Sequence, residues 1–324
     1  MKLDGKKLLV IGGAGFIGSH VVTELLKENV SEVVIFDNLA RGKLSNIGHQ
    51  ILDPRCSVFS AGGDIREVDV LNKAMEGVDG VFHLAAMWLL HCKDFPRTAF
   101  DVNVQGTFNV LEACVNNNVS RLVYSSSASV YGDAVQVPMT EEHPFNNKNF
   151  YGASKIAGEA MARAFFDRYG LSYVGLRYMN VYGPHQDQTA AYTGVIPIML
   201  NKIDANETPE INGDGSQAYD FVTAQDAARC NVLAMKSDIS DEFYNVGTGV
   251  QTSIKELCDT ILKLKQSNLE VKYKPYSQED MRRMVQNRIG CTQKADRDLN
   301  FKYKSDLESG LRDLIQWRAL NLVK

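Results

Sequence analysis

A glycine-rich loop near the N-terminus constrains the fold of this chain more than any other feature. Gly12, Gly15 and Gly18 follow an apolar, strand-like run at 7–11, and a helical pattern follows at 18–27. Glycines permit a tight turn, and the start of a helix presents free backbone N–H groups to an anion. A strand, such a turn and a helix are typical of the first unit of a parallel sheet that binds a dinucleotide pyrophosphate.

Apolar runs and helical patterns continue to alternate along the 324 residues. Further strands are predicted at 32–36, 80–84, 121–125, 174–177 and 243–246, and helices at 68–75, 98–116 and 151–169. This alternation predicts an α/β fold, a Rossmann-type doubly wound parallel sheet covered on both faces. We expect a nucleotide-binding domain at 1–178, completed by about 220–248. The loop-rich segments 179–219 and 249–324 would form a smaller C-terminal substrate lobe.

Composition excludes several classes of protein. The formal net charge is −4 with no basic block, which argues against nucleic acid as a partner. No apolar run reaches the roughly 18 residues of a membrane span, and the N-terminus lacks a signal-peptide core. The six cysteines and six histidines show no metal-ligand spacing, so we expect no metal and reduced thiols. These features predict a cytoplasmic protein that acts on small molecules.

A carboxylate after the second predicted strand indicates which dinucleotide the loop would bind. Asp37 follows the run 32–36 and lies 19 residues beyond Gly18. An acid at this place accepts hydrogen bonds from the adenosine ribose and repels a 2′-phosphate, which favours NAD over NADP. Arg41 weakens that preference only slightly.

A tyrosine and a lysine four residues apart carry the candidate chemistry. Tyr151 and Lys155 begin the predicted helix at 151–169, so their side chains share one face. A neighbouring cation favours the phenolate and lowers the tyrosine pKa, and such a phenol can take a proton from an alcohol. A lone Tyr-x-x-x-Lys is usually two unrelated surface residues. Here a glycine loop and a serine-rich strand end precede it, which favours the chemical interpretation.

The glycine loop, Asp37 and the Tyr-x-x-x-Lys pair together resemble the extended short-chain dehydrogenase/reductases, especially the sugar-nucleotide epimerases and dehydratases. The resemblance covers nearly the whole chain and implies NAD as cofactor and a UDP-sugar as substrate. It also implies a homodimer, because the helices at 98–116 and 151–169 carry apolar residues beyond one face and pair across a two-fold axis in that family.

The resemblance also implies which residues contact the cofactor. They lie in the glycine loop, at the ends of the following strands and on the 151–169 helix. The set is Gly12, Gly15, Phe16, Ile17, Gly18, Asp37, Asn38, Asp64, Ile65, Leu84, Ala85, Ala86, Asn103, Ser125, Tyr151, Lys155 and Tyr178. Asn103 falls where the family has a helix-bending Asn, and a structural duty is favoured over a chemical one.

Three residues are implied as catalytic, namely Ser127, Tyr151 and Lys155. Tyr151 would remove the proton of the sugar 4-hydroxyl while the C4 hydride moves to NAD, and Ser127 would donate to the same oxygen. Lys155 would lower the pKa of Tyr151 and bind the nicotinamide ribose. The 4-keto sugar would then turn over and receive the hydride on its opposite face.

The residues after Ser127 help to choose the reaction. Family dehydratases carry an Asp-Glu pair where this chain has Ala128 and Ser129, and decarboxylases usually carry the Glu. The missing acids favour a 4-epimerase. A dehydratase or decarboxylase, and a non-catalytic NAD-binding redox sensor, remain the alternatives.

The substrate residues implied are Trp88, Ser127, Asn180, Arg282 and Arg288. Tyr219 replaces an Arg that often contacts substrate phosphate, and Arg282 or its neighbour would take over that contact. Arg288 falls where relatives line the hexose, and its forked guanidinium suits a carboxylate. UDP-glucuronate is therefore a candidate beside UDP-glucose. A phosphate contact or a surface position explains Arg288 equally well, and His185 replaces an Arg found in uronate-handling relatives.

Overall fold

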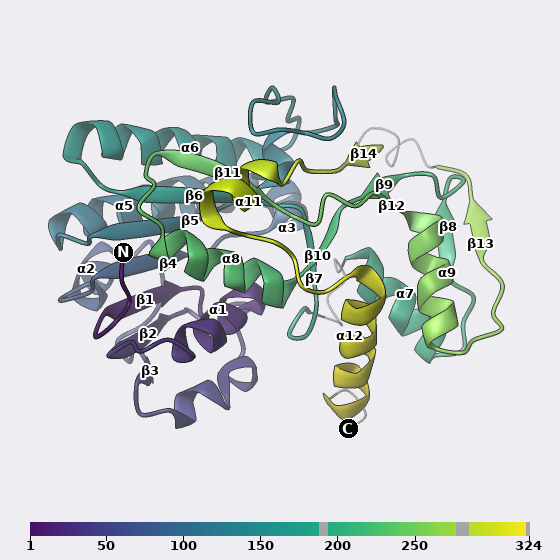
Figure 1. Ribbon diagram of the computed structural model, residues 1–324, viewed down its shortest axis with the longest axis horizontal. Helices are drawn as coiled ribbons and strands as arrows, with labels where there is room; N and C mark the ends of the chain where they lie inside the picture. Colours follow the sequence, from purple (N-terminus) through teal and green to yellow (C-terminus); the bar gives the residue numbers. More distant parts are fainter. Residues whose placement is uncertain (188–193, 277–284, 322–324) are drawn as a thin grey trace.

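Seven parallel strands form the central sheet of the computed structural model, which describes residues 1–187, 194–276 and 285–321 (Figure 1). Their spatial order is β11-β6-β5-β4-β1-β2-β3. The strands are β1 (Lys7–Ile11), β2 (Glu32–Phe36), β3 (Cys56–Val58), β4 (Gly80–His83), β5 (Arg121–Ser127), β6 (Tyr173–Tyr178) and β11 (Glu242–Val246). The strand order reverses between β1 and β4, and ligands bind beyond the strand ends at such a point.

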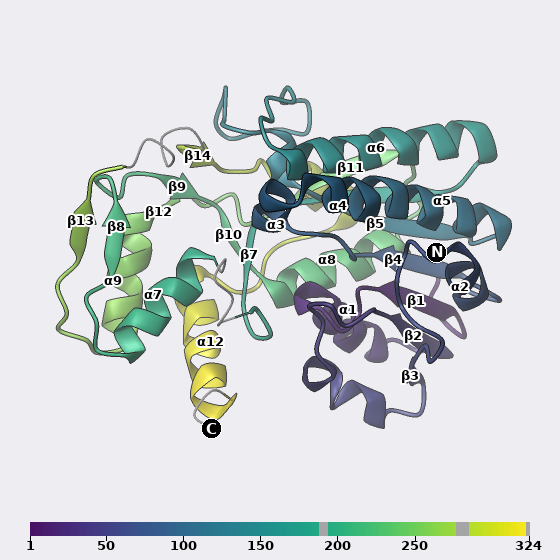
Figure 2. The same cartoon turned by 180° about the vertical axis from the view of Figure 1, so that it is seen from behind.

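Helices cover both faces of this sheet, which confirms the predicted fold class. One face is covered by α1 (Phe16–Leu26), α8 (Ala224–Lys236) and α11 (Gln293–Leu299), and the other by α2 (Val68–Ala74), α5 (Gly106–Asn116) and α6 (Phe150–Tyr169) (Figure 2). Buried aliphatic side chains form a separate core on each face, as expected for a two-sided parallel sheet. Among the described helices, none is long and apolar enough to cross a membrane.

The C-terminal half builds a second lobe with its own core. Its elements are β7 (Asn180–Tyr182), α7 (Val195–Asp204), β8 (Glu210–Asn212), β9 (Ala218–Tyr219), β10 (Phe221–Thr223), β12 (Thr252–Ser253), α9 (Ile254–Leu264), β13 (Lys272–Lys274), β14 (Asn287–Arg288) and α12 (Leu307–Asn321). Leu200, Ile211, Leu257 and Leu311 are buried at its centre. β9 pairs with both β12 and β14, and this pairing brings distant segments beside the sheet.

The segment predicted as one helix at 98–116 is interrupted. After α3 (Leu89–Asp94), the chain forms α4 (Pro96–Phe100), a π-helical turn at Asp101–Gln105, and then α5. Asn103 in this turn accepts a hydrogen bond from the Met87 backbone N–H at 2.6 Å and donates to the Met87 carbonyl at 2.8 Å. The π-helical turn, with its extra residue, thus places the Asn103 side-chain amide where it can bind the backbone of Met87, in the segment after β4.

Candidate active site

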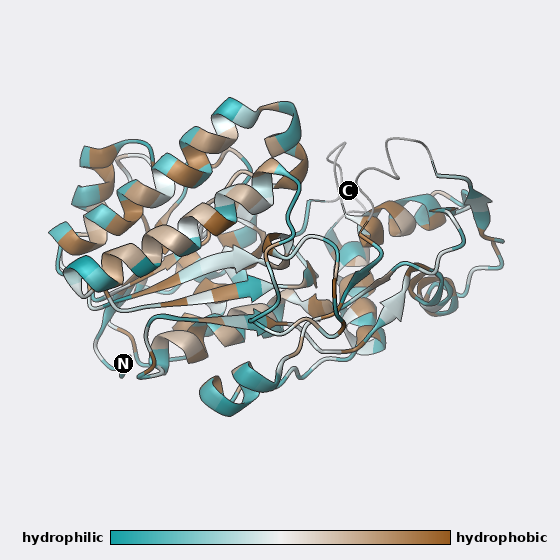
Figure 3. Ribbon diagram, turned by 90° about the horizontal axis from the view of Figure 1, so that it is seen from above, coloured by the Kyte–Doolittle hydropathy of each residue, from teal (hydrophilic) through white to brown (hydrophobic). Residues whose placement is uncertain are grey.

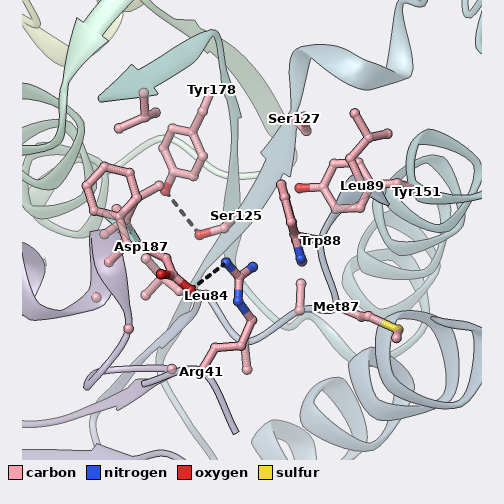
Figure 4. Close-up of a pocket in the computed structure, with 18 of the residues that line it drawn as sticks. Arg41, Leu84, Met87, Trp88, Leu89, Ser125, Ser127, Tyr151, Tyr178 and Asp187 are labelled. Atoms are coloured by element: carbon pink, nitrogen blue, oxygen red, sulfur yellow. Dashed lines mark hydrogen bonds and ion pairs between the residues drawn. The ribbon is translucent and has the colours of Figure 1, made fainter. Parts of the chain in front are cut away.

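A cavity of about 740 Å³ lies beyond the carboxyl ends of the sheet strands and reaches the second lobe (Figure 4). Its lining includes every predicted cofactor residue except Asn103. Of the predicted substrate residues, it includes Trp88, Ser127, Asn180 and Arg288. Arg282 lies outside the described residues. The separate sequence patterns therefore meet in one place.

The glycine loop shapes the floor of this cavity. Gly12 has a φ of +83°, and a Cβ there would lie 2.7 Å from the backbone nitrogen of Ala85. A Cβ on Gly18 would lie 2.0 Å from the Gly12 carbonyl oxygen. Gly15 is the N-cap of α1 and its position has no side-chain cap. The first N–H groups of α1 are thus left for an anion, which is the geometry that a dinucleotide pyrophosphate requires.

Asp37 stands at the end of β2 and is oriented by the loop around it. Its two carboxylate oxygens accept hydrogen bonds from the backbone N–H groups of Ala14, at 3.0 Å, and Leu39, at 2.9 Å. Burial raises the pKa of Asp37, and these backbone donors oppose the rise. Each oxygen keeps free acceptor capacity, so the carboxylate can still bind ribose hydroxyls.

Three serines end β5, and their surroundings differ. The Ser125 hydroxyl lies 3.0 Å from the Tyr178 hydroxyl, and Ser126 donates to a Glu159 oxygen at 2.5 Å. The Ser127 hydroxyl accepts from the backbone N–H of Ser129, at 3.1 Å, and also interacts with the Tyr151 side chain. Ser127 lines the cavity, so its hydroxyl can reach a ligand there.

Helix α6 brings Tyr151 and Lys155 to the same cavity. Asn149 caps its start by accepting from the Gly152 N–H at 2.8 Å. The Lys155 amino group lies 5.8 Å from the centroid of the Tyr151 ring and donates to the Ser125 carbonyl oxygen at 2.7 Å. The shared helix face predicted from the spacing is thus present, with the ammonium directed to the end of β5.

The predicted electrostatic effect of Lys155 on Tyr151 is wrong for this structure. Burial raises the pKa of Tyr151 to about 12, while the Ser127 hydroxyl and the more distant Arg288 charge oppose the rise. Burial also lowers the pKa of Lys155 to about 8. Helical spacing alone could not show this, because desolvation of a phenol favours its neutral form and depends on the whole cavity wall.

Asn103, for which a structural duty was favoured, lies behind the cavity wall. Asn103 is buried and is absent from the cavity lining. Besides its two bonds to Met87, its amide nitrogen donates to the Ser154 hydroxyl at 3.1 Å. Asn103 therefore ties the segment after β4 to α6, and acts on the site through those elements.

Two features of the site were not predicted. Glu159 forms a buried, two-bond ion pair with Arg177 behind the end of β5. Its position four residues after Lys155 on the same helix face was a usable signal. The other feature is a contact of Arg41 with Trp88 and Asp187, which no local pattern reveals because these residues are far apart in sequence.

Known proteins agree with this arrangement. The model of the NAD dependent epimerase/dehydratase family matches residues 8–247. A putative UDP-glucose 4-epimerase of Methanocaldococcus jannaschii is 36% identical over 318 residues, which cover 97% of this chain and 99% of the relative.

Solved structures show the same fold. A UDP-N-acetylglucosamine 4-epimerase of Methanobrevibacter ruminantium, in complex with UDP-N-acetylmuramic acid, superposes with a TM-score of 0.90 at 32% identity over 99% of both chains. A dTDP-glucose 4,6-dehydratase of Streptomyces venezuelae with NAD bound gives a TM-score of 0.89 at 29% identity over 97% of both chains.

The fold and the site define a dinucleotide-dependent protein of the extended short-chain dehydrogenase/reductase class. This chain belongs to the NAD dependent epimerase/dehydratase family, and its cofactor is NAD. The glycine cradle, the free start of α1 and the Asp37 carboxylate fit that cofactor. Because both epimerases and dehydratases share the fold, the reaction must be argued from the side chains at the sugar end.

Proposed function

We propose that this protein interconverts the C4 epimers of a UDP-sugar through a 4-keto intermediate. One observation carries the proposal: Ser127, Tyr151 and Lys155 line one end of the cavity, and no carboxylate joins them there among the described residues. The acids that line the cavity are Asp37, Asp64 and Asp187, which belong to the loops after β2, β3 and β7. The relatives named UDP-sugar 4-epimerases support the same conclusion.

The residues would divide the work as follows. Tyr151 takes the proton of the sugar 4-hydroxyl and later returns it, while Ser127 donates to the same oxygen. Lys155, which donates to the Ser125 carbonyl oxygen, would bind the nicotinamide ribose. NAD supplies the acceptor and donor of the C4 hydride. Tyr151 and Lys155 are thus both binding and catalytic residues, with Asn180 and Trp88 beside the substrate.

Elimination of water and loss of carbon dioxide are the competing reactions. Both require an acid or base near C5 or C6 of the sugar. Ala128 and Ser129 are buried at the positions where relatives carry those acids, and Ser129 lines the cavity. Mass spectrometry of the product separates the reactions, because an epimer keeps the mass of the substrate. A product lighter by water or carbon dioxide refutes the proposal.

Arg288 favours an acidic sugar, with UDP-glucuronate preferred over UDP-glucose. Its Nε atom is buried and has no hydrogen-bond partner among the described residues, and its charge acts on Tyr151, where the sugar reacts. A carboxylate would give this guanidinium two charge-assisted hydrogen bonds, which a neutral hydroxymethyl group cannot give. The solved relative that holds UDP-N-acetylmuramic acid is a precedent for an acidic nucleotide sugar in this fold.

The substitution Arg288→Leu tests the sugar preference. Leaving a guanidinium unpaired costs roughly 1–3 kcal/mol, which corresponds to about 5- to 150-fold in specificity. We expect Arg288→Leu to erase or invert the ratio of kcat/KM values for UDP-glucuronate and UDP-glucose, with NAD content unchanged. If the variant weakens both sugars and UDP itself equally, Arg288 binds the diphosphate and the sugar need not be acidic.

A non-catalytic redox sensor is the remaining alternative, and Tyr151→Phe distinguishes it. The substitution removes the proton acceptor and keeps the ring, so epimerisation should fall by roughly 10²- to 10⁴-fold while NAD remains bound. A panel of UDP- and dTDP-sugars, with C4 epimers resolved by chromatography, provides the assay. Unchanged turnover in Tyr151→Phe would remove the catalytic assignment.

We also propose a homodimer formed through the helices on the α5/α6 side. Phe100, Phe108 and Phe150 are 52%, 41% and 60% exposed there, and apolar residues recur along these helices (Figure 3). Val110 and Phe165 on the same helices pack into the core beneath, so only part of the apolar pattern is left for a partner. An isologous contact would bury the exposed rings. A monomer mass by light scattering at micromolar concentration would refute the dimer.

A further inference from the structure

Arg41 crosses the mouth of the cavity to reach two other segments. It lies in the loop after β2, and its guanidinium carbon is 4.6 Å from the centroid of the Trp88 ring, which follows β4. One guanidinium nitrogen lies 4.0 Å from a carboxylate oxygen of Asp187, in the loop after β7 (Figure 4). We call Arg41, Trp88 and Asp187 the Arg41 strap.

The sheet order shows what lies beneath the strap. β1 lies between β2 and β4 in the sheet, and the glycine loop at Gly12–Gly18 leaves the end of β1. A side chain that reaches from the β2 loop to the β4 loop must therefore pass in front of the glycine loop. That is where the free N–H groups of α1 face the cavity.

The other cations of the cavity wall are already engaged elsewhere. Arg66 forms an ion pair with Asp64 at 2.6 Å, and Lys155 donates to the Ser125 carbonyl. Arg288 lies on β14, at the end where Tyr151 stands. Among the described lining residues, Arg41 is thus the remaining Arg or Lys.

The ion pair between Arg41 and Asp187 is long and partly exposed, so Arg41 can also bind an anion. The side chains of Arg41 and Asp187 are 40% and 31% exposed, and their 4.0 Å separation is too long for a hydrogen bond. Exposed pairs of this kind contribute little. The forked guanidinium can therefore donate to phosphate oxygens on one side while its plane stays on Trp88.

The Asp187 end of the strap is anchored to the helix that faces the pyrophosphate. His185, two residues before Asp187, lies 2.8 Å from the Ser19 hydroxyl through Nδ1, and its ring stacks on His20 at 5.0 Å. His20 in turn lies 3.0 Å from the Pro184 carbonyl oxygen. Since Ser19 and His20 belong to α1, these contacts fix the segment before Asp187 to that helix.

We propose that Arg41 binds the pyrophosphate of NAD on the side opposite α1 and that the Arg41 strap retains the cofactor between turnovers. The proposal rests on the placement of NAD along the glycine loop. The pyrophosphate would receive backbone N–H groups from α1 on one side and a guanidinium on the other. A strap of this kind suits a reaction that regenerates NAD in every cycle, because release of the cofactor is then unproductive.

The test measures the nucleotide and not turnover, so it is independent of whether the protein is an epimerase. The full-length protein is loaded with NADH, and its release into excess NAD is followed by fluorescence. The variant Arg41→Met keeps an apolar stem over Trp88 and removes the charge. The control Lys43→Ala removes an exposed cation from the same loop.

Arg41→Met should release NADH roughly 10- to 150-fold faster than the wild-type protein, as expected for one lost charge-assisted contact. The variant should also be purified with less bound NAD, and Lys43→Ala should match the wild type. Unchanged release from Arg41→Met, or equal effects in both variants, overturns the proposal. So does a variant that loses affinity for UDP but not for NADH, because Arg41 would then bind the substrate.

Discussion

Two regions beside the cavity each enclose an arginine, Arg177 buried and Arg288 half-buried, and they provide it with different partners. Behind the ends of β5 and β6, Arg177 donates to both oxygens of Glu159, at 2.9 and 2.7 Å, and also to the Tyr131 hydroxyl. In the lobe wall, Arg288 has a buried Nε without a hydrogen-bond partner among the described residues. The first cation receives its counter-charge from the fold, and the second receives none from the residues that the structure describes.

The pKa values differ in the same sense. Burial lowers the pKa of Arg177, but its hydrogen bonds to Glu159 and Tyr131 and their charges raise it above its usual value. Burial lowers the pKa of Arg288, and only the more distant charges of Tyr219, Asp133 and Tyr151 oppose the effect. A buried charge is costly unless it is paired. We therefore infer that Arg177 stabilises the fold, whereas Arg288 binds a negatively charged ligand.

Breaking the paired site should have the largest effect on stability. Glu159→Ala leaves the Arg177 guanidinium buried without its counter-charge, and we expect a loss of about 3–5 kcal/mol in the free energy of unfolding. Urea unfolding of the variant measures it. The matched control is Glu308→Ala, which breaks exposed pairs with Arg312 and Lys263 and should cost at most about 1 kcal/mol. Similar small losses in both variants would contradict the distinction.

The same contrast separates what the sequence could and could not predict. The glycine loop, Asp37, Tyr151 and Lys155 depend on short spacings within single strand–helix units, and all of them line the cavity. Local spacing determines which side chains share a face, and parallel strands bring their ends to one edge. The sheet and this half of the site therefore followed from the sequence.

The contacts between residues far apart in the chain could not be predicted from the sequence. The partners Arg41 and Asp187 are joined only by the folded lobe, and the orphan Nε of Arg288 depends on the pairing of β14 with β9. Burial is likewise a property of the whole wall, so the direction of the Tyr151 pKa shift was predicted wrongly. The interruption at Asp101–Gln105 was implied only by the resemblance, as a helix-bending Asn103, because the bonds of Asn103 go to a segment outside its own helix and leave no helical pattern to read.

Lys155 is a third buried cation and is intermediate, because its ammonium has one carbonyl partner and a pKa of about 8. Between about pH 8 and 10.5, the ordinary pKa of a lysine, the unfolded chain holds a proton that the folded protein has released. The free energy of unfolding should therefore gain up to about 1.4 kcal/mol per pH unit from this group as pH rises.

Lys155→Met should lack that gain, and urea unfolding of both proteins at pH 7.5 and 9.5 isolates it by difference. The buried phenol of Tyr151 titrates with the opposite sign, because its folded pKa is the higher one. Its effect begins only above about pH 10, where an unperturbed tyrosine ionises. If the wild type and Lys155→Met gain the same stability between pH 7.5 and 9.5, the pKa of Lys155 is not lowered by burial.

The smallest expected effect is at Arg288, and its sign is the most informative. Arg288→Leu removes a guanidinium whose Nε has no hydrogen-bond partner among the described residues, so the desolvation cost disappears with the charge while some packing of the side-chain stem is lost. We expect the free energy of unfolding without sugar nucleotide to stay equal or rise by about 1 kcal/mol. Arg177→Leu is the matched substitution, and it should destabilise because it strands the Glu159 carboxylate. If Arg288→Leu destabilises as much as Arg177→Leu, the fold itself satisfies Arg288, and the argument that its counter-charge comes from the substrate fails.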